Sequence, residues 1–283
     1  MNDSTSHLAH LLDTPWPATR LSRFVEGAKS PFWGWRLMNG TPRLWKYAVI
    51  PIVFNLLITM LVLAMLFGLT VWFIHSVHPW FHEGWGAWTA WLGWLLEIGA
   101  VLILVVLALG VTLITYMILS GILCGYFYGR LAEEVEVLLG MPREELQSIS
   151  ILAEAVDTAV SVAELIVVNV GFLLFGFIPL VGPPVALVGS TYWNWAIFGL
   201  EYLTYPLSLR GQRRGQRRRY CKRNRPHNLG LGSVVMLMQF IPVLGAVPLA
   251  TAAAGSVLLQ RRIEAHERQV APSQVPIVDE GLS

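Results

Sequence analysis

Four residues around position 40 have types and a spacing that suit the binding of an oxyanion. Gly40 and Thr41 belong to a turn, and Arg43 and Lys46 follow it where a long apolar helix is expected to begin. The first N–H groups of a helix lack carbonyl partners, so together with two cations they can replace the water around an anion. We therefore expect an anion-binding site at these four residues. The alternative is that Arg43 and Lys46 only anchor the helix at a lipid–water interface, which is a routine use of such side chains.

Four other polar residues lie in or beside apolar segments, where an ionisable or amide group is unusual. Glu97 is a functional candidate by its position, although a place near the outer interface would keep it hydrated. Asn169 and Asn194 either line a pore or form hydrogen bonds between helices. Together with Glu201, these residues are the set that we expect as possible pore-lining residues.

The elements that would position these residues are organised around two unusual turns. Residues 177–184 read Phe-Ile-Pro-Leu-Val-Gly-Pro-Pro, and residues 240–248 read Phe-Ile-Pro-Val-Leu-Gly-Ala-Val-Pro. Turns of proline and glycine usually lie in water, so turns without any charge between apolar runs predict an apolar surrounding. The turn residues of interest are Pro179, Gly182, Pro183, Pro242 and Gly245.

The composition is typical of an integral membrane protein. The chain has 283 residues, of which 55% are hydrophobic and 13% are charged. Residues 47–74 contain no charged side chain and exceed the roughly 20 residues that a helix needs to cross a bilayer. Residues 92–128 form a second long apolar stretch, which only Glu97 interrupts. We therefore expect two long spanning helices, the second of which continues beyond the membrane until the turn at Gly140.

The distribution of basic residues predicts the topology. The connection 75–90 has no lysine or arginine, whereas the stretch that begins at Arg210 and ends at Arg225 is strongly basic and has no acidic residue. The positive-inside bias then puts the connection outside and both termini in the cytoplasm of a bacterial inner-membrane protein. We expect the basic stretch to contact anionic lipid rather than nucleic acid, because Tyr220 is its only aromatic residue.

The apolar arms around the first turn are short for a membrane span. Residues 165–178 would form a helix of roughly 21 Å, against a hydrocarbon core of roughly 30 Å. Residues 185–200 are similar, and residues 229–259 repeat the plan around the second turn. Arms of this length predict two re-entrant helical hairpins, whose tips stay within the membrane where protein or water satisfies the backbone.

The predicted fold class is an all-α integral membrane protein with two long transmembrane helices, two re-entrant hairpins and amphipathic cytoplasmic segments. Residues 20–36 predict one amphipathic helix at the membrane interface. Residues 143–164 predict another, with Glu154, Asp157, Ser161 and Glu164 on one face. The expected domains are a flexible tail at 1–22, a single permease domain at 23–262 and a disordered cytoplasmic tail at 263–283.

Several of these segments together resemble a known family. Residues 131–136 read Leu-Ala-Glu-Glu-Val-Glu after the second long helix, and residues 201–206 read Glu-Tyr-Leu-Thr-Tyr-Pro before the basic stretch. With the two Phe-Ile-Pro turns, they resemble the CysZ-type sulfate permeases, which share a domain with the eukaryotic etoposide-induced membrane proteins. The resemblance covers residues 23–262 and implies a homo-oligomer that takes up sulfate for cysteine synthesis.

The resemblance also bears on the expected anion site. The family's site resembles a Gly-Leu-Arg-Arg turn before the first long helix, and Arg43-Leu44-Trp45-Lys46 stands there in this sequence. Lys46 keeps one basic position, Trp45 replaces the other, and Arg43 replaces the glycine. The family usually has an acidic residue where Thr204 stands. The chain has therefore diverged at the anion-site motif.

The expected function is an inner-membrane permease or channel for sulfate or a related oxyanion. The alternatives are a non-transporting membrane scaffold and a transporter of another small anion on the same fold. An enzyme or a cofactor is not expected, because the sequence has no nucleophile–base pair, phosphate-binding loop or dinucleotide motif. No metal centre is expected either, because Pro79 interrupts the segment that contains His75, His78 and His82.

Overall fold

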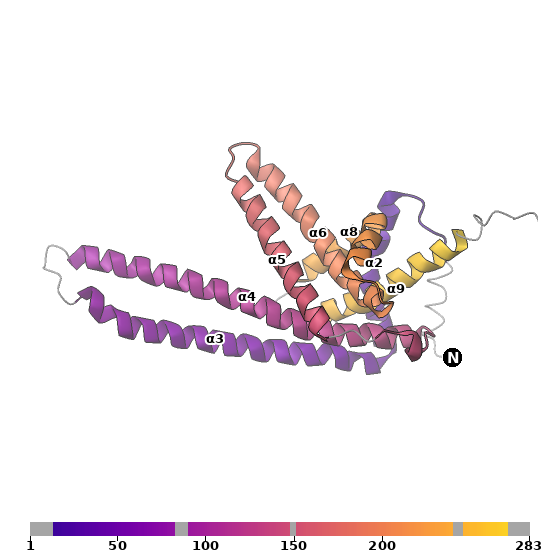
Figure 1. Cartoon of the computed structure of the whole chain (residues 1–283), viewed down its shortest axis with the longest axis horizontal. Coiled ribbons are helices and arrows are strands. Elements are labelled where there is room, and N and C mark those ends of the chain that lie inside the picture. Colours follow the sequence, from indigo (N-terminus) through magenta and orange to yellow (C-terminus); the bar gives the residue numbers. More distant parts are fainter. Residues whose placement is uncertain (1–13, 83–89, 148–150, 240–245, 271–283) are drawn as a thin grey trace, which may run out of the picture. The chain divides into compact units, whose positions relative to one another are not determined.

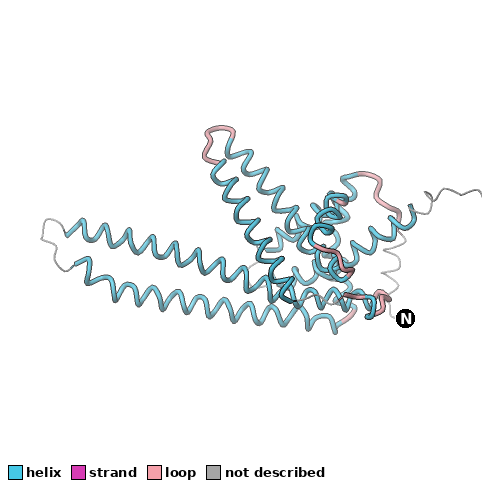
Figure 2. The backbone as a smooth tube through the Cα atoms, in the orientation of Figure 1, coloured by secondary structure: helices cyan, strands magenta, loops and turns pink. Residues whose placement is uncertain are grey.

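The computed structural model describes residues 14–82, 90–147, 151–239 and 246–270, and the regular structure in these ranges is helical (Figures 1 and 2). This confirms the all-α expectation. In chain order the elements are α2 (Arg20–Gly40), η1 (Pro42–Leu44), α3 (Trp45–His82), α4 (Ala90–Leu138), η2 (Arg143–Glu145), α5 (Ile151–Phe175), α6 (Gly182–Leu209), α7 (Arg214–Arg223), α8 (Arg225–Gln239) and α9 (Ala246–Val270).

The helices divide into two compact units. One unit is Val53–Cys124, and the other combines Met1–Ile52 with Gly125–Ser283. Helices α3 and α4 contain two stretches that are long and apolar enough to cross a membrane, Pro42–Trp72 and Trp91–Gly110. Only 6% of each stretch is buried, so the protein itself does not cover these apolar side chains. The two long apolar helices predicted from the sequence are thus present.

The larger unit is built on α2, α6, α8 and α9. Helix α2 makes its most extensive contacts with α9 and α8, and α6 packs against α8 and α9. The side chains of Leu37 and Met38 in α2 are buried in this bundle. The helix predicted for residues 20–36 therefore exists. The face that packs into the bundle is formed by small and polar residues such as Gly27, Ser30 and Gly34. Its apolar side chains stay exposed, namely Leu21, Val25, Phe32 and Trp35.

Glycines bring the helix backbones of this bundle unusually close together. A Cβ atom on Gly230 would lie 1.9 Å from the carbonyl oxygen of Phe24, and one on Gly232 would lie 1.8 Å from that of Trp195. A Cβ atom on Gly34 would lie 2.0 Å from a carbonyl oxygen in α9. No other residue fits these three helix crossings, which resemble the small-residue contacts between helices in membranes.

The first apolar turn joins α5 to α6 and is shaped by its glycine and prolines. A Cβ atom on Gly182 would lie 2.5 Å from the carbonyl oxygen of Phe175, so only glycine fits where the chain turns into α6. Pro183 stands in the first turn of α6, where its missing N–H is not needed. Leu180 has a φ of 68°, in the left-handed region, and its side chain is 92% exposed.

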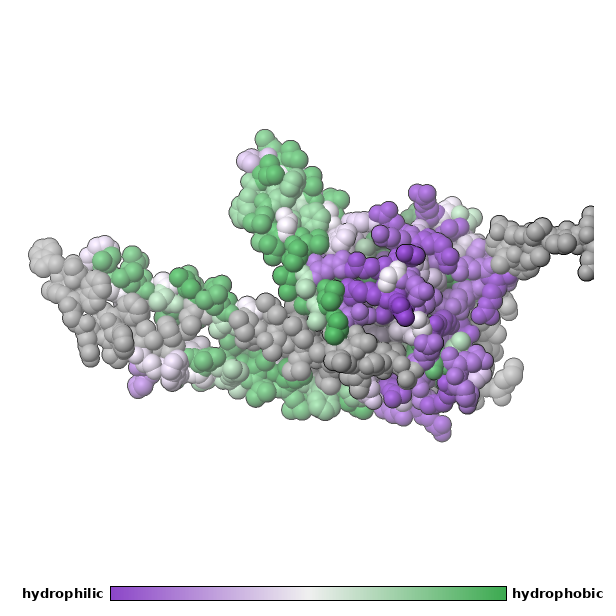
Figure 3. Space-filling model, in the orientation of Figure 1, coloured by the Kyte–Doolittle hydropathy of each residue, from purple (hydrophilic) through white to green (hydrophobic). Residues whose placement is uncertain are grey.

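The arms of this hairpin are longer than the sequence analysis expected. Helices α5 and α6 have 25 and 28 residues, which correspond to roughly 37 and 42 Å. The amphipathic segment expected as a separate element at 143–164 is, from residue 151 onward, the first part of α5. Both arms are apolar near the turn. Farther from it, α5 carries the acidic residues Asp157 and Glu164, whereas α6 packs into the bundle through mainly apolar residues such as Leu203. Figure 3 shows the apolar surface of the projecting part of this hairpin.

The second predicted hairpin differs from the first in its surroundings. Helices α8 and α9 contact each other, and both are covered by α2 and α6. Leu231, Val235 and Val257 are fully buried there. The turn residues Pro242 and Gly245 lie outside the described residues. Helix α9 continues to Val270 with Ile263 buried, so the expected boundary at residue 262 falls within a helix.

A buried carboxylate joins the end of α4 to this bundle. Glu136 has a fully buried side chain, and it accepts hydrogen bonds of 2.6 Å from Nη1 of Arg210 and of 2.6 Å from Nε of Arg261. Arg210 follows the last residue of α6, and Arg261 lies within α9. A buried charge with two charged partners of this kind fixes the position of the chain around α4, α6 and α9.

Candidate functional site

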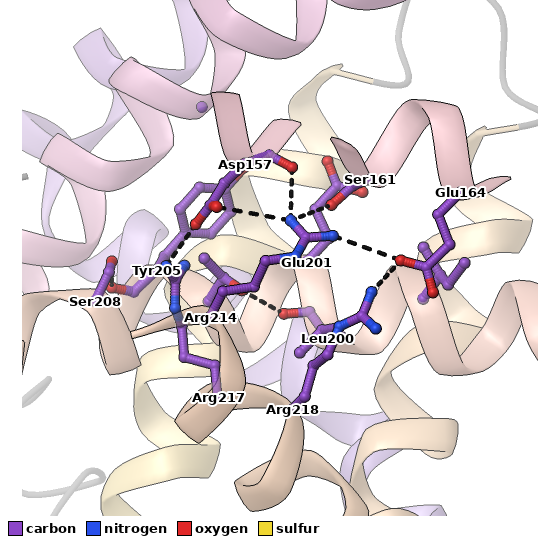
Figure 4. Close-up of a pocket in the computed structure, with 13 residues that line it drawn as sticks. Asp157, Ser161, Glu164, Leu200, Glu201, Tyr205, Ser208, Arg214, Arg217 and Arg218 are labelled. Carbon is purple, nitrogen blue, oxygen red and sulfur yellow. Dashed lines mark hydrogen bonds and ion pairs between the residues drawn. The ribbon is translucent and has the colours of Figure 1, made fainter. Parts of the chain in front are cut away.

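The larger unit contains a pocket of about 90 Å³ at the base of the first hairpin, lined by charged as well as apolar residues (Figure 4). This space is large enough for several water molecules or a small ion. Helices α5, α6 and α7 supply most of the lining, and α4 contributes Gly125. The charged residues of the lining are Asp157, Glu164, Glu201, Arg214, Arg217 and Arg218.

Asp157 of α5 binds two of the arginines. Its carboxylate Oδ2 accepts a hydrogen bond of 2.6 Å from Nη2 of Arg217. Its main-chain carbonyl oxygen accepts one of 2.8 Å from Nη1 of Arg214. The Arg214 guanidinium also lies 3.7 Å from the Asp157 Oδ1 atom. One acidic residue thus holds two cations of α7 against α5.

Glu164 binds the remaining arginine and shares Arg214. Its Oε2 atom accepts from Nη2 of Arg218 and lies 3.5 Å from Nη2 of Arg214. Ser161, which lies between the two acids on α5, accepts a hydrogen bond of 3.3 Å from Nη1 of Arg214. The arginines and acids form a continuous network, and Arg214 is at its centre.

Helix periodicity explains how the sequence produces this network. Asp157, Ser161 and Glu164 are four and three residues apart, so they lie on one face of α5. On α7, Arg217 and Arg218 follow Arg214 by three and four residues, so all three share one face of that helix. The two charged stripes are complementary.

Glu201 lines the same pocket and is not part of the network. In the part of the chain that the structure describes, its carboxyl group has no hydrogen bond or ion pair. It lies outside the two candidate spans, in the last third of α6. Although its side chain keeps some exposure towards the pocket, the surrounding protein excludes water from the carboxyl and raises its pKa to about 7. The group changes its charge near neutral pH.

The arginine network keeps spare hydrogen-bond donors. The Nε atoms of Arg217 and Arg218 are buried and have no acceptor among the described residues. A buried donor without a partner is rare and calls for an explanation, such as a ligand or an ion. The pocket therefore contains donors without acceptors and, at Glu201, a carboxyl group without a donor.

The four residues predicted as an anion site lie at the junction between α2 and α3. Gly40 ends α2, and Thr41 precedes η1 without a capping bond from its side chain. Arg43 and Lys46 are exposed, and the Lys46 Nζ atom lies 4.8 Å from the ring centroid of Tyr47. The N–H groups of Leu44 and Trp45 are already bonded within η1.

A second pocket lies next to this junction. It has a volume of about 320 Å³, and Tyr47 forms part of its wall. Its arginines are paired, since Arg130 binds Glu133 over 2.8 Å and Arg143 binds Glu134 over 2.6 Å. Arg43 and Lys46 do not line it.

The predicted pore-lining residues have different locations. Asn169 and Asn194 exchange two side-chain hydrogen bonds of 2.9 and 3.2 Å, which connect α5 to α6. Of the two expectations for these residues, the structure thus shows the hydrogen bonds between helices. Glu97 lies in α4, but its side chain is outside the described residues. Glu201 alone of the set lines the charged pocket.

Six cations of the basic stretch contact residues of this chain. Arg210 binds Glu136, Arg223 binds Glu267 over 2.7 Å and Arg225 contacts Tyr192, in addition to the three pocket arginines. Arg219 and Lys222 are exposed and form no ion pair within the described chain. The spacing of Asp157, Ser161 and Glu164 was visible in the sequence, but only the fold identifies arginines as their partners.

These features define the protein as a helical membrane protein with a charged pocket in its larger unit. Residues 30–248 match the model of the family described as sulfate transporter CysZ/etoposide-induced protein 2.4. The match covers more than half of the chain, so the chain belongs to this family, as the resemblance of its motifs suggested. The family's description names a transporter rather than an enzyme. No curated protein matches the sequence.

Proposed function

We propose that the protein is a permease or channel for sulfate or a related small oxyanion. The observation that carries this proposal is the pocket with three arginines at the base of an apolar hairpin. Family membership supports it, because the family's description includes a sulfate transporter. In this proposal the protein supplies sulfate for cysteine biosynthesis and works as a homo-oligomer in the bacterial inner membrane.

The arginines of the pocket suit an oxyanion better than lysines would. A guanidinium presents several N–H donors in a plane and binds carboxylate, phosphate or sulfate oxygens in pairs. Asp157 and Glu164 occupy these donors in the present structure. An entering oxyanion exchanges with them, so the acids hold the cations in place while no ligand is bound.

Arg43 and Lys46 are proposed as a first contact for the anion at the α2–α3 junction, together with Gly40 and Thr41. Both cations are exposed, so an anion reaches them without breaking an ion pair. Replacing both with alanine is expected to weaken oxyanion binding while expression of the protein stays normal. Unchanged binding would mean that they only anchor the helix.

The proposed arrangement in the membrane places the α5–α6 hairpin as a re-entrant element, with its tip in the apolar phase. The exposure of Phe177 and Leu180, at 77% and 92%, supports this placement. Because α8 and α9 are packed within the bundle, the same depth is proposed only for the first hairpin. The cytoplasmic side would then contain the pocket, both termini, and contacts of Arg219 and Lys222 with anionic lipid.

Uptake of radiolabelled sulfate and selenate into proteoliposomes tests the proposal. A permease produces flux above that of protein-free vesicles of the same lipid composition. A membrane scaffold on the same fold produces none, and this result would overturn the proposal. The orientation and amount of inserted protein are measured as well, so that an absence of flux cannot be due to failed reconstitution.

A further inference from the structure

The second pocket of the larger unit has no role in the proposed function, and it carries an inference of its own. Its lining combines charges of both signs with aromatic rings, namely Arg130, Arg143, Glu133, Glu134, Tyr47, Tyr126 and Phe127. Its volume of about 320 Å³ is within the range of small-molecule sites. The two cations and two anions cancel, so the lining suits a ligand that carries both charges and is neutral overall.

The ion pairs of this pocket can exchange with such a ligand. Arg143 contacts both acids, since its Nη2 atom donates to Oε1 of Glu134 over 2.6 Å and its Nη1 atom lies 3.8 Å from Oε1 of Glu133. The side chains of Arg130 and Arg143 are 53% and 55% exposed, so water competes for these pairs and each contributes little stability. Within the part of the chain that the structure describes, Oε2 of Glu134 accepts no hydrogen bond. A ligand therefore joins or replaces these contacts at a small cost.

The position of the pocket along the chain indicates a lipid as the source of the ligand. Residues 47–74 of α3 and residues 98–129 of α4 contain no charged side chain, and the pocket lies at one end of each run, at Tyr47 and Arg130. In the proposed membrane arrangement, on which this inference rests, that is the depth of the phospholipid head groups on the cytoplasmic side, where tyrosine is enriched. A phospholipid presents its phosphate at this depth, while its acyl chains stay in the apolar phase.

We propose that this pocket binds the head group of a phospholipid with a primary ammonium group, of which phosphatidylethanolamine is the type. The guanidinium groups of Arg130 and Arg143 bind the phosphate oxygens, for which their planar donors are suited. The carboxylates of Glu133 and Glu134 accept hydrogen bonds from the ammonium N–H groups. No covalent bond forms or breaks.

Two other common phospholipids are disfavoured for different reasons. The quaternary ammonium of phosphatidylcholine has no N–H group to donate, and it would need a free aromatic face. The ring of Tyr126 already has the Arg130 guanidinium 5.7 Å from its centroid, and the ring of Tyr47 has the Lys46 Nζ atom at 4.8 Å. Phosphatidylglycerol has a net negative charge, which would lie unpaired beside the two glutamates.

Native mass spectrometry of the full-length protein in an uncharged detergent tests the inference. Phosphatidylethanolamine, phosphatidylcholine and phosphatidylglycerol with identical acyl chains are added in turn, and the fraction of protein with bound lipid gives the relative affinity. We expect phosphatidylethanolamine to bind about three- to tenfold more tightly than either of the others, because partly exposed charged hydrogen bonds contribute at this level. Soluble phosphoethanolamine has the same charged groups without acyl chains and should bind at least about tenfold more weakly.

Charge substitutions separate direct recognition of the lipid from a structural role. Glu134→Gln leaves one excess positive charge in the pocket, so the preference should shift towards phosphatidylglycerol by about three- to tenfold. Arg143→Gln should weaken the binding of all three lipids, because it removes donors to their phosphate. Glu144→Gln is the matched control, because it makes the same change of charge at an exposed residue that lines neither pocket. It should keep the lipid preference of the unaltered protein.

Three outcomes would overturn the inference. If phosphatidylcholine bound as tightly as phosphatidylethanolamine, the acids would not recognise the ammonium. If Glu134→Gln and Glu144→Gln shifted the preference equally, the effect would be one of overall charge. If soluble phosphoethanolamine bound as tightly as the lipid, the ligand would not be a lipid. The lipid measurement needs no transport, so its failure is distinct from the absence of oxyanion flux that would overturn the proposed function.

Discussion

Single residues in the charged pocket set its response to pH. Glu201 has an ordinary pKa of 4.5 that burial raises to about 7. A carboxyl whose pKa is raised in the folded state prefers to be neutral there. Its contribution to stability is therefore complete below about pH 4.5 and is lost as the pH rises to about 7.

Glu201→Gln should consequently stabilise the protein at about pH 8 by roughly 1–3 kcal/mol, because the amide avoids the cost of a buried charge. At about pH 5 the substitution should have little effect, since the glutamate is then neutral as well. Thermal unfolding of both proteins in the same detergent at the two pH values measures this difference. A stabilisation that is equal at both pH values would contradict the assignment of a raised pKa.

Asp157 also stabilises the fold, because it holds two arginines of α7 against α5. Asp157→Asn removes the negative charge that holds Arg214 and Arg217, so we expect a loss of about 1–3 kcal/mol in the free energy of unfolding. The estimate is moderate because the side chain of Asp157 is 29% exposed. The control Glu144→Gln should unfold at the same temperature as the unaltered protein. If the two variants behaved alike, the network would not stabilise the fold.

At the scale of helices, the crossing of α8 with α6 depends on glycine. Gly232→Ala puts a methyl group where the Trp195 carbonyl oxygen already lies, since the added Cβ would be 1.8 Å from it. We expect a loss of about 3 kcal/mol or more, seen as low yield and a lowered unfolding temperature. Gly215→Ala in α7 is the matched control, because a Cβ there has no neighbour within 4 Å. That control should be neutral or slightly stabilising.

The arms of the first hairpin are connected by the Asn169–Asn194 pair. A double-mutant cycle with alanine at each position should give a coupling energy of about 0.5–1.5 kcal/mol, the range found for hydrogen bonds between helices in membranes. The free energies of unfolding of the two single variants and the double variant provide the measurement. Strictly additive effects would show that the two amides do not stabilise the hairpin through each other.

The sequence predicts helices well where hydropathy alone decides them. Helices α3 and α4 were expected from uninterrupted apolar runs, and the α5–α6 turn from its prolines and glycine. Hydropathy does not predict contacts that helices make through small residues. Helix α2 was expected from its apolar and charged side chains, but it packs into the bundle through glycines. Their contacts involve residues about 200 positions away, such as Gly27 with His227.

The candidate site was predicted only in part for the same reason. Glu201 was selected because it is an acid beside an apolar segment, and it does line the pocket. Asp157 and Glu164 were seen as one face of a helix, and the arginines were interpreted as a topology signal. A stripe of charges on one helix does not identify its partner stripe, so the network between α5 and α7 became visible only with the fold.

On the scale of the whole molecule, the chain combines two apolar spans, one apolar hairpin and a pocket lined by three arginines. The spans and the hairpin leave apolar side chains exposed, and we propose that a bilayer covers both. In the permease proposal, the arginines of the larger unit replace the water that an anion loses. The apolar spans and the hairpin hold the protein in the bilayer.

The most direct test of this account is sulfate and phosphate uptake by proteoliposomes that contain Arg214→Gln, compared with Arg219→Gln from the same helix. Arg214 lies at the centre of the pocket network, whereas Arg219 is exposed and does not line the pocket. We predict that Arg214→Gln lowers the uptake of both ions at least about tenfold, and that Arg219→Gln leaves it within about twofold of the unaltered protein. Equal uptake by the two variants, at equal amounts of folded protein in the vesicles, would contradict the assignment of the pocket as the oxyanion site.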